Sequence, residues 1–379
     1  MTTTPPSDGA PEKATEPKAT ESARASAPAP AGDAPRPRTN ALPLSYAAII
    51  AVLLIVAAIG GGLAVGTVAR PRATVRVATA APTAQPTPTP LPTTDPAVFQ
   101  QTLSSGCTTE QGLWVVTNGG GLIRYDGKDW KQVDGTLRTL THASCDAGIL
   151  YAVGPVGAVL IVDDRARSIN SFDVTVEDLR GVAAMTTGAM VVGTSGMVML
   201  LSGGVWQPYA SGIEEDLNAV VAFDLNSAWV VGSKGISYRL EVAGWRPIPT
   251  GATVTLRALN ASSPQNAVAA GDGGTLLVFD GTWKPIETGV TTNLRSIARL
   301  GSVEWIVGDA GTVLTLDAAG GDHTVPSTKP AQKFDLATTC DLNSVFTTAQ
   351  DVWVIGSTNS RSGVWRIRGD KVVEKWGGC

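Results

Sequence analysis

The sequence of 379 residues is poor in the side chains that most metal and nucleophilic enzymes use. It holds two histidines, His142 and His323, and four cysteines, and none of these lies at metal-ligand spacing. Lys and Arg number 29 against 33 Asp and Glu, so the formal net charge of −4 indicates neither nucleic acid nor an anionic lipid surface as a partner. The composition argues against a metal enzyme and implies no cofactor.

The composition changes sharply near residue 98. Of the 24 prolines, 16 precede residue 98, whereas all ten tryptophans follow it. Residues 1–43 are rich in Pro, Ala, Ser and Thr and have few large apolar side chains, so burial could not offset the entropy lost on folding. We therefore expect a disordered tail over 1–43 and a folded region after it.

A long apolar run follows the tail. No charged residue occurs from Asn40 to Ala69. A helix over 44–69 would be long enough to cross a bilayer, because a helix rises by about 1.5 Å for each residue. A cleaved signal peptide is the alternative, with Ala78-Thr79-Ala80 as its cleavage site, but its first region would have to include the whole tail and would be unusually long. We interpret 44–69 as an uncleaved transmembrane signal anchor.

Residues 70–97 form a Pro/Thr-rich segment that includes Pro86-Thr87-Pro88-Thr89-Pro90. Because proline has a fixed φ angle, the segment favours an extended, semi-rigid conformation, and we expect it to form a stalk. Arginines lie on both sides of the apolar run, so the excess of positive charge on cytoplasmic segments does not determine its orientation. The four cysteines all lie beyond the stalk, which suits an oxidising compartment, and we place the distal domain on the extracytoplasmic side of the cell membrane.

A repeat fills residues 98–379. An apolar strand ends in Val-Gly or a similar pair, and a short turn, a glycine and a second apolar strand follow. The residues that end the first apolar strand serve as markers: Thr117, Gly154, Gly193, Gly232, Gly271, Gly308 and Gly356. They recur at intervals of about 40 residues, a length typical of a propeller blade, and the last interval is the longest.

Further features of the repeat define its architecture. A Leu-Arg or Leu-Asn pair upstream of the marker adds a fourth strand, and the outer tryptophans are expected to fill the gaps between sheets. Seven such repeats predict an all-β fold, a seven-bladed β-propeller with four-stranded antiparallel blades.

Two segments carry a family resemblance, Asp126-Gly127-Lys128-Asp129-Trp130 and Asp280-Gly281-Thr282-Trp283. They resemble the Asp-box repeats of neuraminidase-like propellers. The strand pair Trp-Val-Val-Gly-x-x-Gly is similar to the photosystem II stability and assembly factor family of seven-bladed propellers. The resemblance implies the propeller fold over residues 99–379 and a role as an assembly factor. Sialidases share the Asp-box, but their arginine cluster and Tyr-Glu nucleophile are not identifiable here, so we expect no enzyme.

Four cysteines allow three pairings. Cys107 and Cys145 lie at similar places in the first two repeats, while Cys340 precedes the last repeat and Cys379 ends the chain. We favour Cys107 with Cys145 and Cys340 with Cys379. A bond between Cys107 and Cys379 would instead join the two ends of the ring.

A set of polar residues recurs just upstream of the markers, at the start of each innermost strand. The distance from each to its marker is nearly constant and is longest for Arg138, and blade one supplies Ser104 or a neighbour. Such residues surround the mouth of the central channel, and guanidinium groups suit carboxylates or phosphates. We predict that these residues bind a partner, together with Arg361, which lies in a longer turn of blade seven. The ring residues are Arg138, Arg180, Asn218, Arg257, Arg295 and Asn343.

Two interpretations of this ring stay open. Each Arg or Asn could bind a protein partner, or it could tie its blade to the neighbouring backbone. On the first interpretation the chain is a scaffold or assembly factor for a membrane protein complex. The alternative function is a carbohydrate or cell-envelope binder that stacks sugars on exposed tryptophans, and a glycoside hydrolase is a third candidate.

Overall fold

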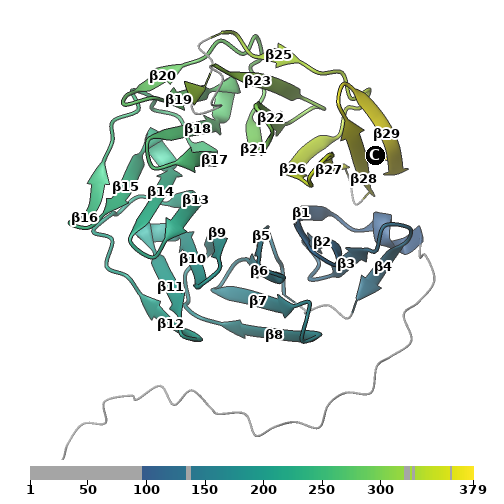
Figure 1. Ribbon diagram of the computed structural model, residues 1–379, viewed down its shortest axis with the longest axis horizontal. Coiled ribbons are helices and arrows are strands. Elements are labelled where there is room, and N and C mark those ends of the chain that lie inside the picture. Colours follow the sequence, from purple (N-terminus) through teal and green to yellow (C-terminus); the bar gives the residue numbers. More distant parts are fainter. Residues whose placement is uncertain (1–95, 134–137, 320–324, 327–328, 359–360) are drawn as a thin grey trace, which may run out of the picture. The chain divides into compact units, whose positions relative to one another are not determined.

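The computed structural model describes residues 96–133, 138–319, 325–326, 329–358 and 361–379. The predicted tail, membrane span and most of the stalk lie outside these residues. No helix within the described ranges has the length and apolar character needed to cross a membrane. The described elements form a ring of β-sheets in chain order (Figure 1).

The first four blades each take four antiparallel strands that follow one another in the chain. A 3-10 helix, η1 (Pro96–Gln100), precedes them. Blade one is β1 (Leu103–Thr109), β2 (Gly112–Thr117), β3 (Leu122–Tyr125) and β4 (Trp130–Val133); blade two is β5 (His142–Asp146), β6 (Ile149–Val153), β7 (Ala158–Asp163) and β8 (Ser168–Asp173). Blade three is β9 (Leu179–Met185), β10 (Gly188–Gly193), β11 (Val198–Ser202) and β12 (Val205–Pro208); blade four is β13 (Leu217–Asp224), β14 (Ser227–Gly232), β15 (Ser237–Glu241) and β16 (Gly244–Pro247).

The remaining blades complete the seven sheets found among the described residues, as the repeat predicts. Blade five is β17 (Leu256–Ser263), β18 (Asn266–Gly271), β19 (Leu276–Phe279) and β20 (Trp283–Pro285); blade seven is β26 (Asp341–Thr347), β27 (Val352–Thr358), β28 (Arg361–Arg368) and β29 (Lys371–Gly377). Blade six departs from four strands, because its third strand pairs with two outer ones: β21 (Leu294–Leu300), β22 (Val303–Gly308), β23 (Val313–Ala319), β24 (Val325–Pro326) and β25 (Gln332–Lys333). The long last interval between markers reflects this addition.

The turn between the second and third strands explains the paired glycines. Gly193 is extended, but a Cβ there would lie 2.1 Å from the carbonyl oxygen of Asp178, so the close approach of two strands requires glycine. Gly196 has φ near +65°, and its Cβ would lie 1.8 Å from the carbonyl oxygen of Ile213. Short 3-10 turns fill the space between such glycines in three blades, at η2 (Thr194–Gly196), η3 (Ser233–Gly235) and η4 (Asp272–Gly274).

The core consists of apolar layers between neighbouring blades. Seven buried clusters occur in the described residues, one at each blade junction. Trp130 and Trp283 are buried in these layers, and Trp206, Trp245 and Trp376 are half-buried against them, as expected of gap-filling side chains.

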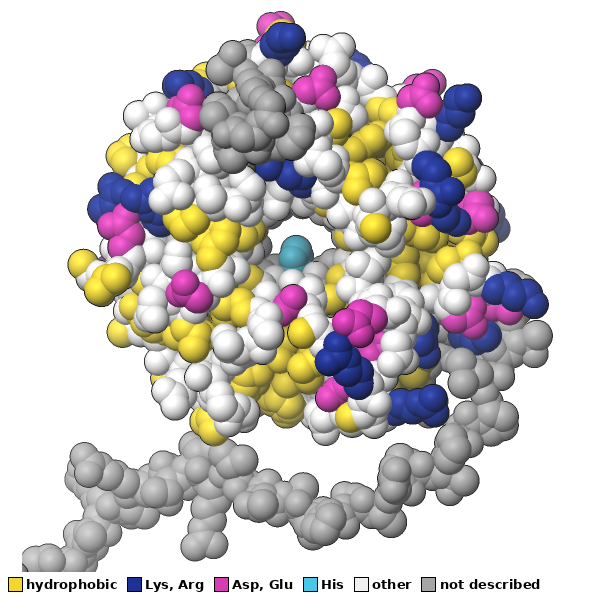
Figure 2. Space-filling model, in the orientation of Figure 1, with side chains coloured by type: hydrophobic (Ala, Val, Ile, Leu, Met, Phe, Trp, Pro, Cys, Tyr) yellow, Lys and Arg dark blue, Asp and Glu magenta, His cyan; other side chains and the backbone are white. Residues whose placement is uncertain are grey.

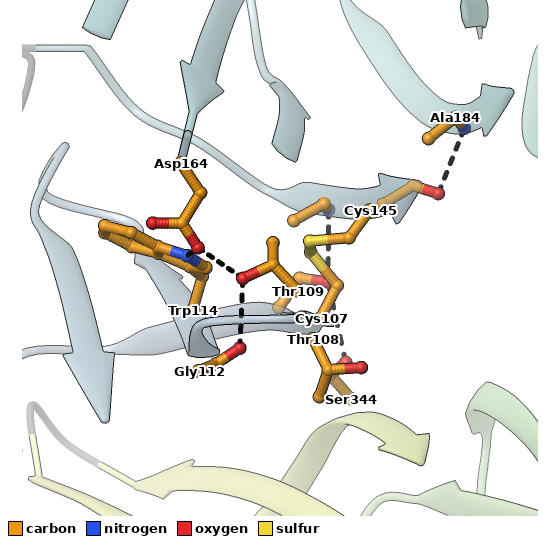
Figure 3. Close-up of a disulfide and its surroundings, with 12 residues drawn as sticks. Cys107, Thr108, Thr109, Gly112, Trp114, Cys145, Asp164, Ala184 and Ser344 are labelled. Atoms are coloured by element: carbon orange, nitrogen blue, oxygen red, sulfur yellow. Dashed lines mark hydrogen bonds between the residues drawn. A yellow bond between two sulfur atoms is a disulfide. The ribbon is translucent and has the colours of Figure 1, made fainter. Parts of the chain in front are cut away.

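Both favoured disulfides are present, Cys107–Cys145 and Cys340–Cys379. The first joins the innermost strands of blades one and two (Figure 3). Beside it, the carboxylate of Asp164 in blade two accepts hydrogen bonds from Thr109 and from Trp114 Nε1 in blade one. The alternative pairing of Cys107 with Cys379 is wrong.

The ring closes without exchange of a strand among the described residues, because blade one holds only the first strands and blade seven only the last. Side chains make the junction instead. Ser362 Oγ of blade seven donates to the carbonyl oxygen of Gln101 at 2.6 Å and accepts from the amide of Leu103 at 3.1 Å. Tyr125 and Trp130 from blade one pack against Trp353 of blade seven. Closure therefore depends on packing and side-chain hydrogen bonds.

Candidate functional site

Most of the predicted ring residues meet at one end of the central channel. A cavity of about 620 Å³ there is lined by one residue at or beside the start of each innermost strand: Ser104, Thr141, Arg180, Asn218, Arg257, Arg295 and Asn343. Each of them directly follows a fully buried leucine. The leucine anchors the start of the strand between blades, so the next side chain faces the opening. We call this cavity the channel mouth.

Blade two corrects the prediction. Arg138 is exposed and pairs with Asp173, and it is not among the residues that line the channel mouth. The buried leucine of this blade is Leu140, so Thr141 takes the ring position. Arg138 also follows a leucine, so the pair matches the Leu-Arg motif, but Arg138 lies farther from its marker than the equivalent residues of the other blades. The constant distance to the marker is the signal that identifies Thr141.

Arg361 also lies apart from the lining. It begins β28 and is exposed, while its cross-strand neighbour Thr358 lines the channel mouth. Residues 359–360 of this turn lie outside the described residues.

Each arginine of the channel mouth pairs with an aspartate. Arg180 lies 3.0 Å from Asp216 of blade four, whereas Arg257 and Arg295 pair with Asp272 and Asp309 of their own blades. The expected local excess of positive charge is therefore largely balanced. The cation is still the more accessible partner in every pair, because the arginine side chains are 38–45% exposed and the carboxylates 22–35%.

The asparagines serve the structural role that the sequence left open. Asn218 Nδ2 donates to the carbonyl oxygen of Leu256 at 2.9 Å, and Asn343 Nδ2 donates to that of Leu103 at 2.8 Å. Each bond joins one innermost strand to the next blade. Arg180 shares in this network, since its Nη1 donates to Asn218 Oδ1 at 3.0 Å. Arg257 and Arg295 pair within their own blades, which leaves these two best placed to bind a ligand.

Sequence reasoning missed a second set of polar residues, which precede the buried leucines. Their side-chain oxygens accept hydrogen bonds from backbone amides in the turn of the preceding blade, at 2.9–3.1 Å. An Asp or Asn just before Leu-Arg or Leu-Asn is the signal that could have found them. They are Asp178, Asp216, Asn293 and Asp341, and they stiffen the face around the channel mouth.

A second cavity of about 440 Å³ adjoins the channel mouth and shares His142, Arg257 and Arg295 with it. A histidine side chain is visible in the central opening (Figure 2). At the strand position of His142 the other six blades carry only serine, alanine or glycine. His142 is half-buried by accessible surface, but the protein atoms packed around it in the channel desolvate the imidazole and lower its pKa to about 4, so it is neutral at pH 7.

This pKa predicts a pH dependence of stability. Below about pH 6.5 the unfolded chain binds a proton that the folded protein excludes until the pH nears 4. The contribution of His142 to the free energy of unfolding is therefore complete well above pH 6.5 and falls on acidification, by at most about 1.4 kcal/mol per pH unit. We expect urea unfolding between pH 7 and pH 4.5 to show a smaller acid loss for His142→Asn than for the wild type. Equal losses in the two proteins would contradict this.

The channel offers little for catalysis. No group of three or more His, Cys, Asp or Glu side chains able to hold a metal ion occurs in the described part of the chain. Cys145 lies close to His142 in sequence but is bonded to Cys107. Three acidic residues precede β13, Glu214-Glu215-Asp216. Two of them form ion pairs, since Glu215 lies 3.6 Å from Lys234 and Asp216 pairs with Arg180.

Comparison with known proteins supports the fold. No protein-family model and no curated protein sequence matches the chain. The solved structure of U3-55K aligns with a TM-score of 0.59 at 12% identity, covering 74% of this chain and 96% of that one. The WD40 propeller domain of Doa1 aligns with a TM-score of 0.59 at 12% identity, covering 72% and 93%. Likeness at this identity is one of fold alone.

A structure of YCF48 bound to D1 peptide aligns at 16% identity with a TM-score of 0.47, covering 59% of this chain and 76% of that chain. This likeness is too weak to bear on function. The resemblance to Asp-box repeats stays a prediction.

Proposed function

We propose that the chain is a scaffold or assembly factor that binds a segment of a membrane protein at the channel mouth. One observation carries the proposal. Three guanidinium groups surround a cavity of about 620 Å³, and each is more exposed than the aspartate that pairs with it. Guanidinium groups with donors left over bind carboxylates in fork geometry, so the segment should carry a carboxylate.

The placement of the protein belongs to the same proposal. The apolar run over 44–69 would anchor the chain in the cell membrane, and residues 70–97 would hold the propeller away from the bilayer. Two disulfides support an oxidising, extracytoplasmic location, since such bonds seldom persist in a reducing cytosol. A partner in or near the same membrane would then lie within reach.

Nothing in the described residues favours the alternatives. None of the ten tryptophans, all of which are described, is exposed, so the sugar-stacking platform expected of a glycan binder is missing. We propose no enzymatic activity and no cofactor.

Isolation of the tagged full-length protein from its native membrane tests the proposal. At low salt we expect a membrane protein to copurify and to be released as ionic strength rises, because the contact involves half-exposed charges. Mass spectrometry identifies the partner. Recovery of the propeller alone at every salt concentration would overturn the scaffold proposal.

A further inference from the structure

Two valines protrude from the face that carries the channel mouth. Val156, in the turn between β6 and β7, is 61% exposed, and Val176, in the loop between β8 and β9, is 84% exposed. The two segments are bound together, since the amide of Val156 donates to Asp178 Oδ1 at 2.9 Å and that of Gly157 to the carbonyl oxygen of Glu177 at 2.7 Å. Val156 and Val176 form what we call the valine patch.

Val156 is an unusual residue for its backbone conformation. Its φ of 54° lies in the left-handed region, which β-branched residues strongly disfavour. The equivalent turn positions in the next four blades hold small or polar residues, Ser195, Lys234, Gly273 and Ala310. Val156 thus combines backbone strain with an apolar side chain left in water, and neither stabilises the fold. Such strain is typical of sites that serve binding.

The valine patch lies across the channel mouth from Arg257 and Arg295, whereas Arg180 of blade three lies on its own side. In a ring of seven blades, blade two stands opposite blades five and six (Figure 1). Thr141 of blade two and the arginines Arg257 and Arg295 line the same cavity. An extended chain laid across this cavity would meet guanidinium groups at one end and the valine patch at the other.

We infer that the channel mouth binds an extended peptide segment in a fixed direction, with a carboxylate on Arg257 and Arg295 and an aliphatic or aromatic side chain on the valine patch. This inference rests on the proposed function and names the chemistry of its partner. Two features favour that direction. Arg257 and Arg295 pair only within their own blades, whereas Arg180 on the near side is held by Asp216 and Asn218 of the next blade. Asp178 beside the valine patch would repel a carboxylate placed there.

Two synthetic peptides test the inference. Each is a fluorescein-labelled dodecapeptide, roughly 40 Å long when extended, with Glu near one end, Gly/Ser spacers, and either Phe or Ser near the other end. With the full-length protein in detergent, we expect the Phe peptide to bind about five- to tenfold more tightly than the Ser peptide. The double variant Val156→Gly with Val176→Ser should remove this difference and leave the Ser peptide unaffected.

The matched control is Val242→Ser, because Val242 is 101% exposed in the turn between β15 and β16 and should leave both affinities unchanged. Val156→Gly alone should raise the melting temperature by about 2 °C while it weakens the Phe peptide, which separates a binding role from a folding role.

Equal affinity of the wild type for both peptides would overturn the inference and leave the proposed function standing. Binding of neither peptide would count against both. A wild-type dimer that dissociates in the double variant would also overturn the inference, because a second copy of the chain would then cover the valine patch.

Discussion

Replacing Trp353 by alanine is expected to lower the free energy of unfolding by about 3–5 kcal/mol. Trp353 is buried, and its ring lies 5.5 Å from the rings of both Tyr125 and Trp376 and 6.3 Å from that of Trp130. The guanidinium of Arg366 lies 5.5 Å above it. The substitution would leave a cavity at the junction of blades seven and one, where no shared strand among the described residues holds the ring closed.

Urea unfolding followed by tryptophan fluorescence measures this effect. Trp229→Ala is the matched control, because Trp229 is also buried, packs against Phe279 and Trp283 and has the guanidinium of Arg239 5.4 Å from its ring, at a junction where the chain runs on from blade four to blade five. We expect the control to lose clearly less stability. Equal losses in the two variants would show that the junction of the ends is no weaker than the other junctions.

Replacing Arg180, Arg257 and Arg295 together by glutamine is expected to weaken partner capture about 100-fold, or about 2.7 kcal/mol. Each guanidinium is half-exposed, so its bond to a partner carboxylate is worth about 1 kcal/mol. The fold should survive, because half-exposed ion pairs contribute at most about 1 kcal/mol each, and the released aspartates stay hydrated.

Affinity for the purified partner, measured at low and at high salt, checks this prediction. The wild type should lose affinity as salt rises, and the triple variant should be both weak and nearly insensitive to salt. Arg165→Gln is the control, since Arg165 pairs with Glu110 at 2.9 Å and lies outside the channel mouth. Unchanged capture by a folded triple variant would rule out the arginines as the binding groups.

Much of the fold follows from local chemistry that repeats along the chain. In blades two to six the paired glycines mark a turn that other residues cannot form without a clash, and their spacing, extended to Thr117 and Gly356, defined seven blades. The pairing of Cys107 with Cys145 was favoured because the two lie at similar places in neighbouring repeats, and this left Cys340 for Cys379. The fifth strand of blade six could not be predicted, because β24 and β25 are only two residues long and carry no pattern of their own.

The sequence predicted the position of the candidate site, but it did not predict that aspartates balance the charge of its arginines. Equal spacing placed Arg180, Arg257 and Arg295 in one ring, because each follows a leucine buried between blades. Their pairing with aspartates in other turns depends on how the turns fold over the channel mouth, which spacing does not reveal. The valine patch was missed for a similar reason, since exposure of an apolar residue is a property of the folded face.

Site-specific photo-crosslinking tests the central proposal most directly. Asn118 is exposed and lines the channel mouth but belongs to neither the arginines nor the valine patch. With benzoylphenylalanine at Asn118 of the full-length protein in its native membrane, we predict a crosslink to one segment of a membrane protein that bears a carboxylate. The same group at Val205, exposed on the outer strand β12, should give none. Crosslinks from Val205 with none from Asn118 would place the binding surface on the rim and contradict the account.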